Sequence, residues 1–255
     1  MKEYIYFRQG PISLAVPLHS SFIPYATFFA GEYDFLSPGK GDIVIDAGAN
    51  IGDYSIKIAR KVRRVVAIEP SSANLKLLEM NAAHFPNITI VKKALGNTRK
   101  TIGFRGQGVG ASVDENSDVT VEMDTLDNIC ANLEITPTIL KMDIEGQEAN
   151  ALEGFKEHLK SVKRAVIEIH DVDNKVRCER ILRDFGFKLR YQTKFDVVKR
   201  TFKNVLLHPL AFVSYDRANS FYAFKVIFNF PFSRKTSIPS CGEVSGMYLL
   251  EARRE

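Results

Sequence analysis

Short apolar runs alternate with longer amphipathic stretches through most of this chain. The apolar runs are rich in Val and Ile, which is typical of buried β-strands, and they occupy residues 43–45, 65–68, 88–91, 138–142, 165–169 and 187–191. Helical patterns fill the spaces between them, beginning near Asp53 and covering residues 71–83, 124–133, 147–160 and 174–185. This alternation predicts an α/β fold in which helices cover both faces of a mostly parallel sheet.

Other segments fall outside this alternation. Two short β-like runs, 101–104 and 119–123, flank a glycine-rich loop, and residues 247–253 are predicted to form a final strand. Residues 192–240 would then be an insertion between the sixth and seventh strands. The predicted organisation is an N-terminal extension that could act as a lid, a core, and the insertion, over residues 1–40, 41–191 plus 241–255, and 192–240.

The turn after the first strand carries the most informative chemistry. The strand ends in Asp46 and breaks into a turn made of Gly48, Ala49, Asn50, Ile51 and Gly52. The next strand ends in Glu69, which Pro70 follows. Small residues let the backbone approach a ligand closely, and an acid about 20 residues further on can accept hydrogen bonds from a ribose. The pattern indicates a nucleotide-binding α/β domain, and a turn without any ligand is the alternative.

This turn departs from the dinucleotide fingerprint. It has two glycines where Gly-x-Gly-x-x-Gly has three, and Asp46 precedes the first of them. An acid at this place would repel a pyrophosphate but would suit a ligand with an ammonium and a sulfonium group. S-adenosylmethionine is such a ligand, because it has no phosphate, a ribose for Glu69 and an amino group for the acidic turn.

Four polar residues stand at the same rim of the predicted sheet. Asp46, Glu69, Asp143 and His170 each lie at the carboxyl end of a strand. Ligands of open parallel sheets bind outside these ends. We therefore expect the four side chains in one ligand site.

The composition limits the class of protein but does not indicate a function. The 255 residues suit one domain with an insertion or two small domains, and 45% hydrophobic residues allow a sizeable core. Cys130, Cys178 and Cys241 are widely spaced, so neither a disulfide framework nor a zinc site is predicted. The N-terminus has no long apolar stretch, and no apolar run reaches about 18 residues. We therefore expect a cytoplasmic protein without a membrane span.

The insertion is basic and aromatic. Residues 192–240 hold eight Lys and Arg against two Asp, while the whole chain has a net charge of +5. This mixture suits a nucleic-acid surface, where bases stack and phosphates are neutralised. It also suits a membrane surface, with Phe228, Phe230 and Phe232 entering the lipid beside Arg234 and Lys235. A lid over the substrate and a solvated basic face are the remaining alternatives.

Six segments, in order along the chain, carry a family resemblance. They are residues 44–52, 66–70, 93–96, 124–127, 140–146 and 166–170. With these segments the chain resembles the FkbM-type family of S-adenosylmethionine-dependent methyltransferases. The resemblance implies a Rossmann-like core of the class I type, with seven strands of which the last is antiparallel. It also implies methyl transfer usually to oxygen, often to a sugar or natural-product hydroxyl.

The resemblance also implies roles for single residues. The methionine half of the cofactor would contact Asp46, Gly48, Asn50 and Gly52, and the ribose would contact Glu69. Ala94 and Leu95 would contact the edge of the adenine. Ala49 and Pro70 complete the set of residues expected to bind the cofactor. Two nearby segments could close over the cofactor, through Glu32 before the core and Ser112 at the end of the glycine-rich loop.

A hydroxyl acceptor must also lose its proton, to a base or with the help of a metal. The candidates are Asp143, Glu145 and His170, and we favour His170 as the base because a free imidazole titrates near neutral pH. Each of the three could instead have a structural role. A divalent cation held by these residues and Asp171 is a further alternative that we do not favour.

The predicted function is therefore O-methylation of a glycan, a lipid-linked sugar or a small natural-product-like molecule, with S-adenosylmethionine as cofactor. An RNA methyltransferase that uses the insertion is one alternative. A regulatory module that binds the cofactor without turnover is another, and a dehydrogenase is a weaker one. The oligomeric state is left open.

Overall fold

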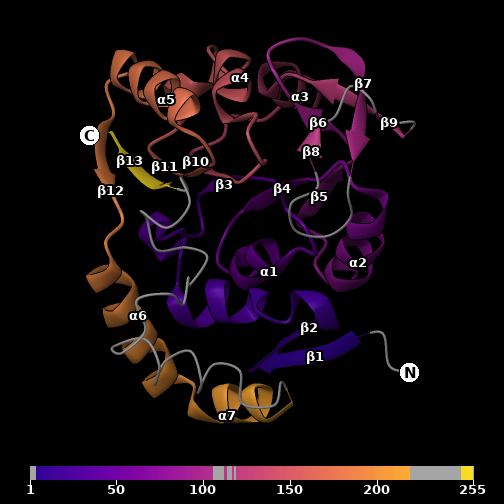
Figure 1. The fold of residues 1–255 in the computed structure, drawn as a ribbon, viewed down its shortest axis with the longest axis vertical. Coiled ribbons are helices and arrows are strands. Elements are labelled where there is room, and N and C mark those ends of the chain that lie inside the picture. Colours follow the sequence, from indigo (N-terminus) through magenta and orange to yellow (C-terminus); the bar gives the residue numbers. More distant parts are fainter. Residues whose placement is uncertain (1–3, 106–111, 114–116, 118, 219–247, 255) are drawn as a thin grey trace.

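A seven-stranded sheet forms the centre of the protein (Figure 1). The computed structural model describes residues 4–105, 112–113, 117, 119–218 and 248–254. Across the sheet the strands are β12 (Lys188–Tyr191), β13 (Tyr248–Arg253), β11 (Arg164–Ile169), β10 (Ile139–Met142), β3 (Ile43–Ala47), β4 (Arg64–Ile68) and β5 (Ile88–Val91). Six of these strands run in the same direction, and β13 runs antiparallel to them. The predicted Rossmann-like fold is confirmed, including its antiparallel last strand.

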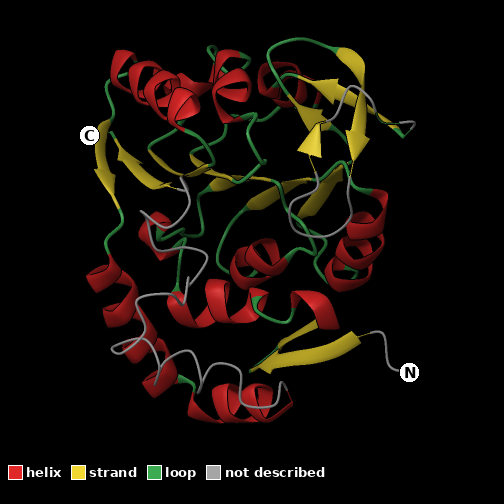
Figure 2. Ribbon diagram, in the orientation of Figure 1, coloured by secondary structure: helices red, strands yellow, loops and turns green. Residues whose placement is uncertain are grey.

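Helices cover both faces of the sheet (Figure 2). One face packs against α3 (Leu126–Asn132), α4 (Glu148–Glu153) and α5 (Val172–Asp184), and the other against α1 (Asp53–Ala59) and α2 (Ser72–Ala82). The alternation of side chains along a strand decides this division. In β3, Ile45 and Ala47 join the first of these cores, whereas Val44 packs with Tyr54 and Ile58 of α1.

The helix predicted over residues 147–160 is shorter than expected. The structure ends α4 at Glu153 and continues after a turn with a short 3-10 helix, His158–Ser161. Gly154 is the C-cap residue, and the close approach of Gly96 requires glycine there, because an added Cβ would lie only 2.4 Å from the carbonyl oxygen of Gly96. The sequence pattern contains no sign of this close contact between distant segments.

A second, smaller sheet stands beside the main one. Its order is β6 (Ala94–Leu95), β9 (Thr120–Asp124), β7 (Lys100–Arg105) and β8 (Ser112–Val113). The strands β7 and β9 confirm the two short β-like runs in the sequence. Residues 106–111 of the glycine-rich loop lie outside the described residues.

Residues 4–36 and 194–218 together form a third layer against α1 and α2 (Figure 1). The first part comprises the hairpin β1 (Tyr4–Gln9) and β2 (Ile12–Pro17), the 3-10 helices Leu18–Ser20 and Asp34–Leu36, and the π-helix Tyr25–Ala30. The second part comprises α6 (Lys194–Leu207), which packs along the π-helix, and α7 (Pro209–Ala218), which packs against β1.

Aromatic side chains hold this third layer together. The rings of Phe7 and Tyr215 lie 5.3 Å apart and those of Phe29 and Phe212 lie 5.1 Å apart, both edge to face. The side chain of Asn81 in α2 bonds both backbone groups of Ala15, which joins the hairpin to the core. The extension and the described part of the insertion are therefore integral to the packing.

Candidate active site

The turn between β3 and α1 is fixed by contacts within the protein. Gly48 and Gly52 have φ values of +74° and +86°, which favour glycine. A Cβ on Gly48 would lie 1.7 Å from the carbonyl oxygen of Asp143, and one on Gly52 would lie 2.6 Å from Leu78. The sequence suggests that these glycines admit a ligand, but packing against neighbouring segments already requires them.

Glu69 holds the same turn from the end of β4. Its carboxylate accepts hydrogen bonds from the backbone N–H of Asn50 and of Ser71, both at 2.9 Å, and from the Asn74 amide at 3.2 Å. Burial raises the pKa of Glu69, and these bonds oppose the rise. An ionised carboxylate has about four accepting positions. Glu69 therefore retains capacity for one more donor, and Pro70 follows it directly.

Asp46 is paired with a residue that the sequence analysis did not select. The carboxylate is fully buried and lies 3.1 Å from the Lys141 ammonium, and it accepts a hydrogen bond from the Ser55 hydroxyl at 2.6 Å. Lys141 also donates to the carbonyl oxygen of Gly48 at 2.6 Å. Burial lowers the pKa of Lys141, but the carboxylates of Asp46 and Asp143 raise it above its usual value. The charge of Asp46 is thus already neutralised.

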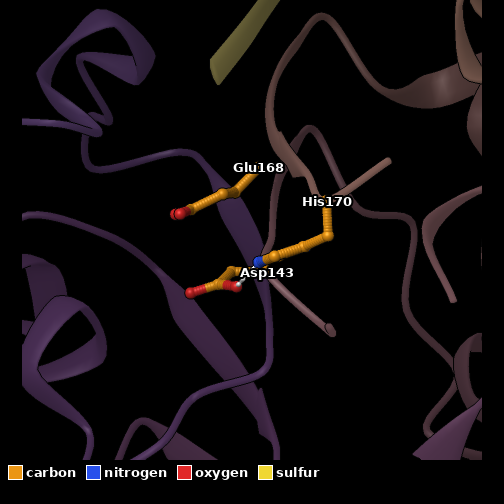
Figure 3. A group of neighbouring side chains, drawn as sticks. All are labelled: Asp143, Glu168 and His170. Carbon is orange, nitrogen blue, oxygen red and sulfur yellow. Dashed lines mark ion pairs between the residues drawn. The ribbon is translucent and has the colours of Figure 1, made fainter. Parts of the chain in front are cut away.

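Asp143, Glu168 and His170 come together where β10 and β11 end (Figure 3). The Nε2 atom of His170 lies 3.7 Å from the Asp143 carboxylate and 3.3 Å from that of Glu145. Its Nδ1 atom lies 2.8 Å from the fully buried carboxylate of Glu148, the first residue of α4.

The electrostatics of this group follow from its carboxylates. Burial would lower the pKa of His170, but the hydrogen bond with Glu148 and the charges of Asp143 and Glu145 raise it to about 9. At pH 7 the imidazole is therefore a cation. Burial and the charges of Asp143 and Glu32 raise the pKa of Glu168 well above its usual range.

The segment before the core covers this rim. The Tyr33 ring is buried, with its centroid 5.2 Å from the Lys141 ammonium and 5.2 Å from the Tyr54 ring. Burial and the charges of Asp143 and Glu168 raise the pKa of Tyr33. Glu32 is also buried, and its carbonyl oxygen accepts a hydrogen bond from the Gln192 side chain at 3.0 Å.

The structure places the other predicted residues less centrally. Ala94 and Leu95 are buried in β6, where their backbones pair with β9. Ser112 belongs to β8, and its side chain lies outside the described residues. Asp171 caps α5, since its carboxylate accepts a hydrogen bond from the Asn174 backbone at 2.7 Å. This bond accounts for Asp171 as a structural residue.

Sequence reasoning missed several residues of the site, and their signals differ. Lys141 and Glu168 are charged residues inside apolar strands, a pattern that a search for interrupted strands would have found. Glu148 resembles any acid in the first turn of a helix. Its contact with His170 depends on the packing of α4 against β11, which the local sequence does not encode.

Comparisons with known proteins place this chain among methyltransferases. A curated relative, the hexuronic acid methyltransferase AglP of Haloferax volcanii, is 27% identical over 137 residues, which cover 51% of this chain and 57% of the relative. A solved FkbM methyltransferase from Methylobacillus flagellatus KT is 22% identical, with a TM-score of 0.51, over 67% of this chain and 44% of that one. The chain thus spans little more than half of the first and less than half of the second. A family model, the methyltransferase FkbM domain, matches residues 46–193, more than half of the chain, which therefore belongs to the FkbM methyltransferase family.

Proposed function

We propose that this methyltransferase takes its methyl group from S-adenosylmethionine. The main support is the charge of the rim, where the carboxylates of Asp143, Glu145 and Glu148 outnumber the His170 cation that they contact, while the Lys141 cation is paired with Asp46. Such a site repels the pyrophosphate of a dinucleotide and attracts a sulfonium and an ammonium group. Its residues therefore fit the positively charged cofactor.

The residues around the turn would hold this cofactor. Glu69 has an accepting position left for a ribose hydroxyl, and the turn 48–52 presents its backbone beside it. The methionine half would lie toward Asp53 and Asp143, whose charges act on Lys141. Ala94 and Leu95 would contact the adenine edge through the end of β6.

The cofactor supplies a methyl group that its positive sulfur already activates, so the protein mainly positions the acceptor and excludes water. A hydroxyl acceptor must also lose a proton. Asp143 and Glu145 are suited to receive it, because each side chain is 29% exposed and close to His170. His170 itself can act as a base only after losing the proton that its pKa of about 9 retains at pH 7.

The dependence of kcat/KM on pH separates these bases. If His170 is the base, kcat/KM rises with pH until about 9, and His170→Ala lowers turnover by about 10²–10⁴-fold. If a carboxylate is the base, kcat/KM does not follow the titration of His170, and Asp143→Asn or Glu145→Gln causes the larger loss of kcat/KM. A His170→Ala variant with full activity would leave that residue a structural role.

We propose a hydroxyl of a glycan as the acceptor. The relative from Haloferax volcanii is named for hexuronic acid, a sugar with several hydroxyl groups, and the rim offers carboxylates that could take a hydroxyl proton. With a hydroxyl as acceptor, oxygen is the methylated atom. Nitrogen of a nucleic acid is the competing acceptor.

Two measurements test the proposal. Thermal shift with S-adenosylmethionine and with NAD should show stabilisation by the former, about 2.7 kcal/mol at 100 times its Kd. Transfer of labelled methyl groups into a hexuronate-containing glycan, RNA and lipid extracts should then label the glycan. Stabilisation by NAD alone would refute the cofactor, labelled RNA would refute the acceptor, and tight binding without any label would indicate a regulatory module.

The described part of the insertion favours a membrane surface over a nucleic acid as a further partner. Phe212 and Tyr215 are buried and unavailable for base stacking. By contrast, α6 exposes Phe195 and Phe202 by 75% and 70%. Together with Val198 and Leu206 they form one stripe along the helix, which the exposed residues Lys194, Lys199 and Lys203 flank. Residues 219–240, including the Phe and basic residues singled out in the sequence, lie outside the described residues.

We infer that this stripe contacts an anionic lipid surface, because exposed apolar residues beside lysines suit an interfacial helix. No helix in the described part of the chain has the length and apolar character needed to cross a membrane. The full chain should co-sediment with vesicles of anionic lipid, and the double variant Phe195→Ser, Phe202→Ser should lose this binding. Unchanged co-sedimentation of the variant would overturn the inference, and so would binding to RNA in place of vesicles.

A further inference from the structure

Three potential metal ligands meet at the end of two neighbouring strands. Asp143, Glu168 and His170 each offer one ligand atom, and these atoms all lie within 4.8 Å of one another (Figure 3). Opposite ligands of an octahedral ion such as Mg²⁺ or Mn²⁺ lie about 4.2 Å apart, twice the metal–oxygen distance. Because β10 and β11 pair directly, the sheet fixes the relative position of the three residues.

The orientation of His170 suits a metal ligand. Its Nδ1 atom lies 2.8 Å from the Glu148 carboxylate, while its Nε2 atom is buried, has no hydrogen-bond partner within the described residues and faces Asp143 and Glu145. In protein metal sites, a ligating histidine donates its other N–H to a carboxylate or carbonyl, which fixes the tautomer. Glu148 is held in turn by the backbone N–H of Gly146 at 2.8 Å.

The charge of the group also calls for a cation. The carboxyl group of Glu168 is buried, and no hydrogen bond or ion pair joins it to the described part of the chain. Asp143 repels it, and this repulsion is only partly offset by His170 and by Lys141, which is itself paired with Asp46. Burying several carboxylates around a single imidazole is costly, because one cation does not offset all of them. A dication among them would remove this cost.

We propose that Asp143, Glu168 and His170 bind a divalent transition-metal ion, with Glu145 within reach and Glu148 orienting the imidazole, whose Nε2 releases its proton to the solvent when the ion binds. A mixed set of one imidazole and carboxylates favours Mn²⁺ or Zn²⁺ over Ca²⁺, which prefers oxygen alone. If the chain methylates a hydroxyl as proposed above, an ion here would lower the pKa of that hydroxyl when the acceptor lies beside it. The ion-binding site itself does not depend on that function.

Titration of the metal-free full chain with Mn²⁺ in a calorimeter, without any cofactor, tests the site. We expect one ion per chain. His170→Gln should weaken binding at least 10-fold, and Glu148→Gln should weaken it about 10–100-fold through the orientation of the imidazole. His158→Gln is the matched control, because His158 pairs with Asp127 at 2.9 Å away from the site, and it should bind Mn²⁺ like the unaltered chain.

A second measurement covers variants that fail to fold. Pulsed electron paramagnetic resonance of Mn²⁺ bound to the unaltered chain should show coupling to an imidazole nitrogen. Absence of binding to the folded chain, absence of this coupling, or equal binding by His170→Gln and His158→Gln would overturn the site. Labelled methyl transfer is measured separately, so transfer without Mn²⁺ binding refutes only the metal, and Mn²⁺ binding without transfer refutes only the proposed function.

Discussion

Replacing Lys141 by methionine tests whether a buried cation holds the turn after β3. The ammonium lies 3.1 Å from the fully buried carboxylate of Asp46 and donates to the Gly48 carbonyl at 2.6 Å. Methionine keeps most of the side-chain volume but leaves Asp46 charged and without its counterion. Removing one partner of a buried ion pair costs about 3–5 kcal/mol. We therefore expect the free energy of unfolding to fall by about this amount.

Urea denaturation measures the loss. With a slope of about 2–3 kcal/mol per molar urea, the midpoint should fall by roughly 1–2 M. Lys92→Met is the control, because Lys92 lies 2.6 Å from Glu79 with both side chains exposed, and its loss should stay below about 1 kcal/mol. The double variant Asp46→Asn, Lys141→Met should lose less than the sum of the single variants, since no charge is left unpaired. Equal midpoints for Lys141→Met and Lys92→Met would refute the reasoning.

Three further predictions follow from the same site. Gly48→Ala should lower the free energy of unfolding by more than about 2 kcal/mol in urea melts, because the strain of the left-handed backbone adds to the clash with Asp143. Gly10→Ala is the control, because an added Cβ there meets nothing within 4 Å, and it should lose about 1 kcal/mol. Equal losses would contradict this prediction. Glu69→Gln should weaken S-adenosylmethionine binding by about 1–3 kcal/mol in calorimetry, because an NH₂ group replaces one of the two accepting oxygens of the side chain. Unchanged affinity would remove Glu69 from the site. Burial raises the pKa of Asp53 to about 6, although the Lys141 charge and the hydrogen bond from Thr27 lower it. The native state therefore holds a proton that the unfolded state releases. Stability should therefore fall as pH rises from about 4 to 6, and Asp53→Asn should flatten that slope in melts at each pH.

The sequence alone determined the order of the elements and the position of the rim. The periodicity of the strands and helices depends on local preferences for backbone conformation and for burial, which each segment expresses by itself. The same is true of the residues of the turn 46–52. Since parallel strands end at one edge, the sequence also predicts that Asp46, Glu69, Asp143 and His170 lie along the same edge of the sheet.

The tertiary structure alone decided which partners those residues have. Lys141 neutralises Asp46 because β3 and β10 pair in register, and Glu148 reaches His170 because α4 packs on β11. The packing of residues 4–36 with α6 and α7 likewise joins segments far apart in the chain. Charge pairing, burial and pKa depend on such distant contacts, which local sequence patterns do not contain. The sequence therefore predicted which strand ends carry polar residues, and only the fold determined their partners and charge states.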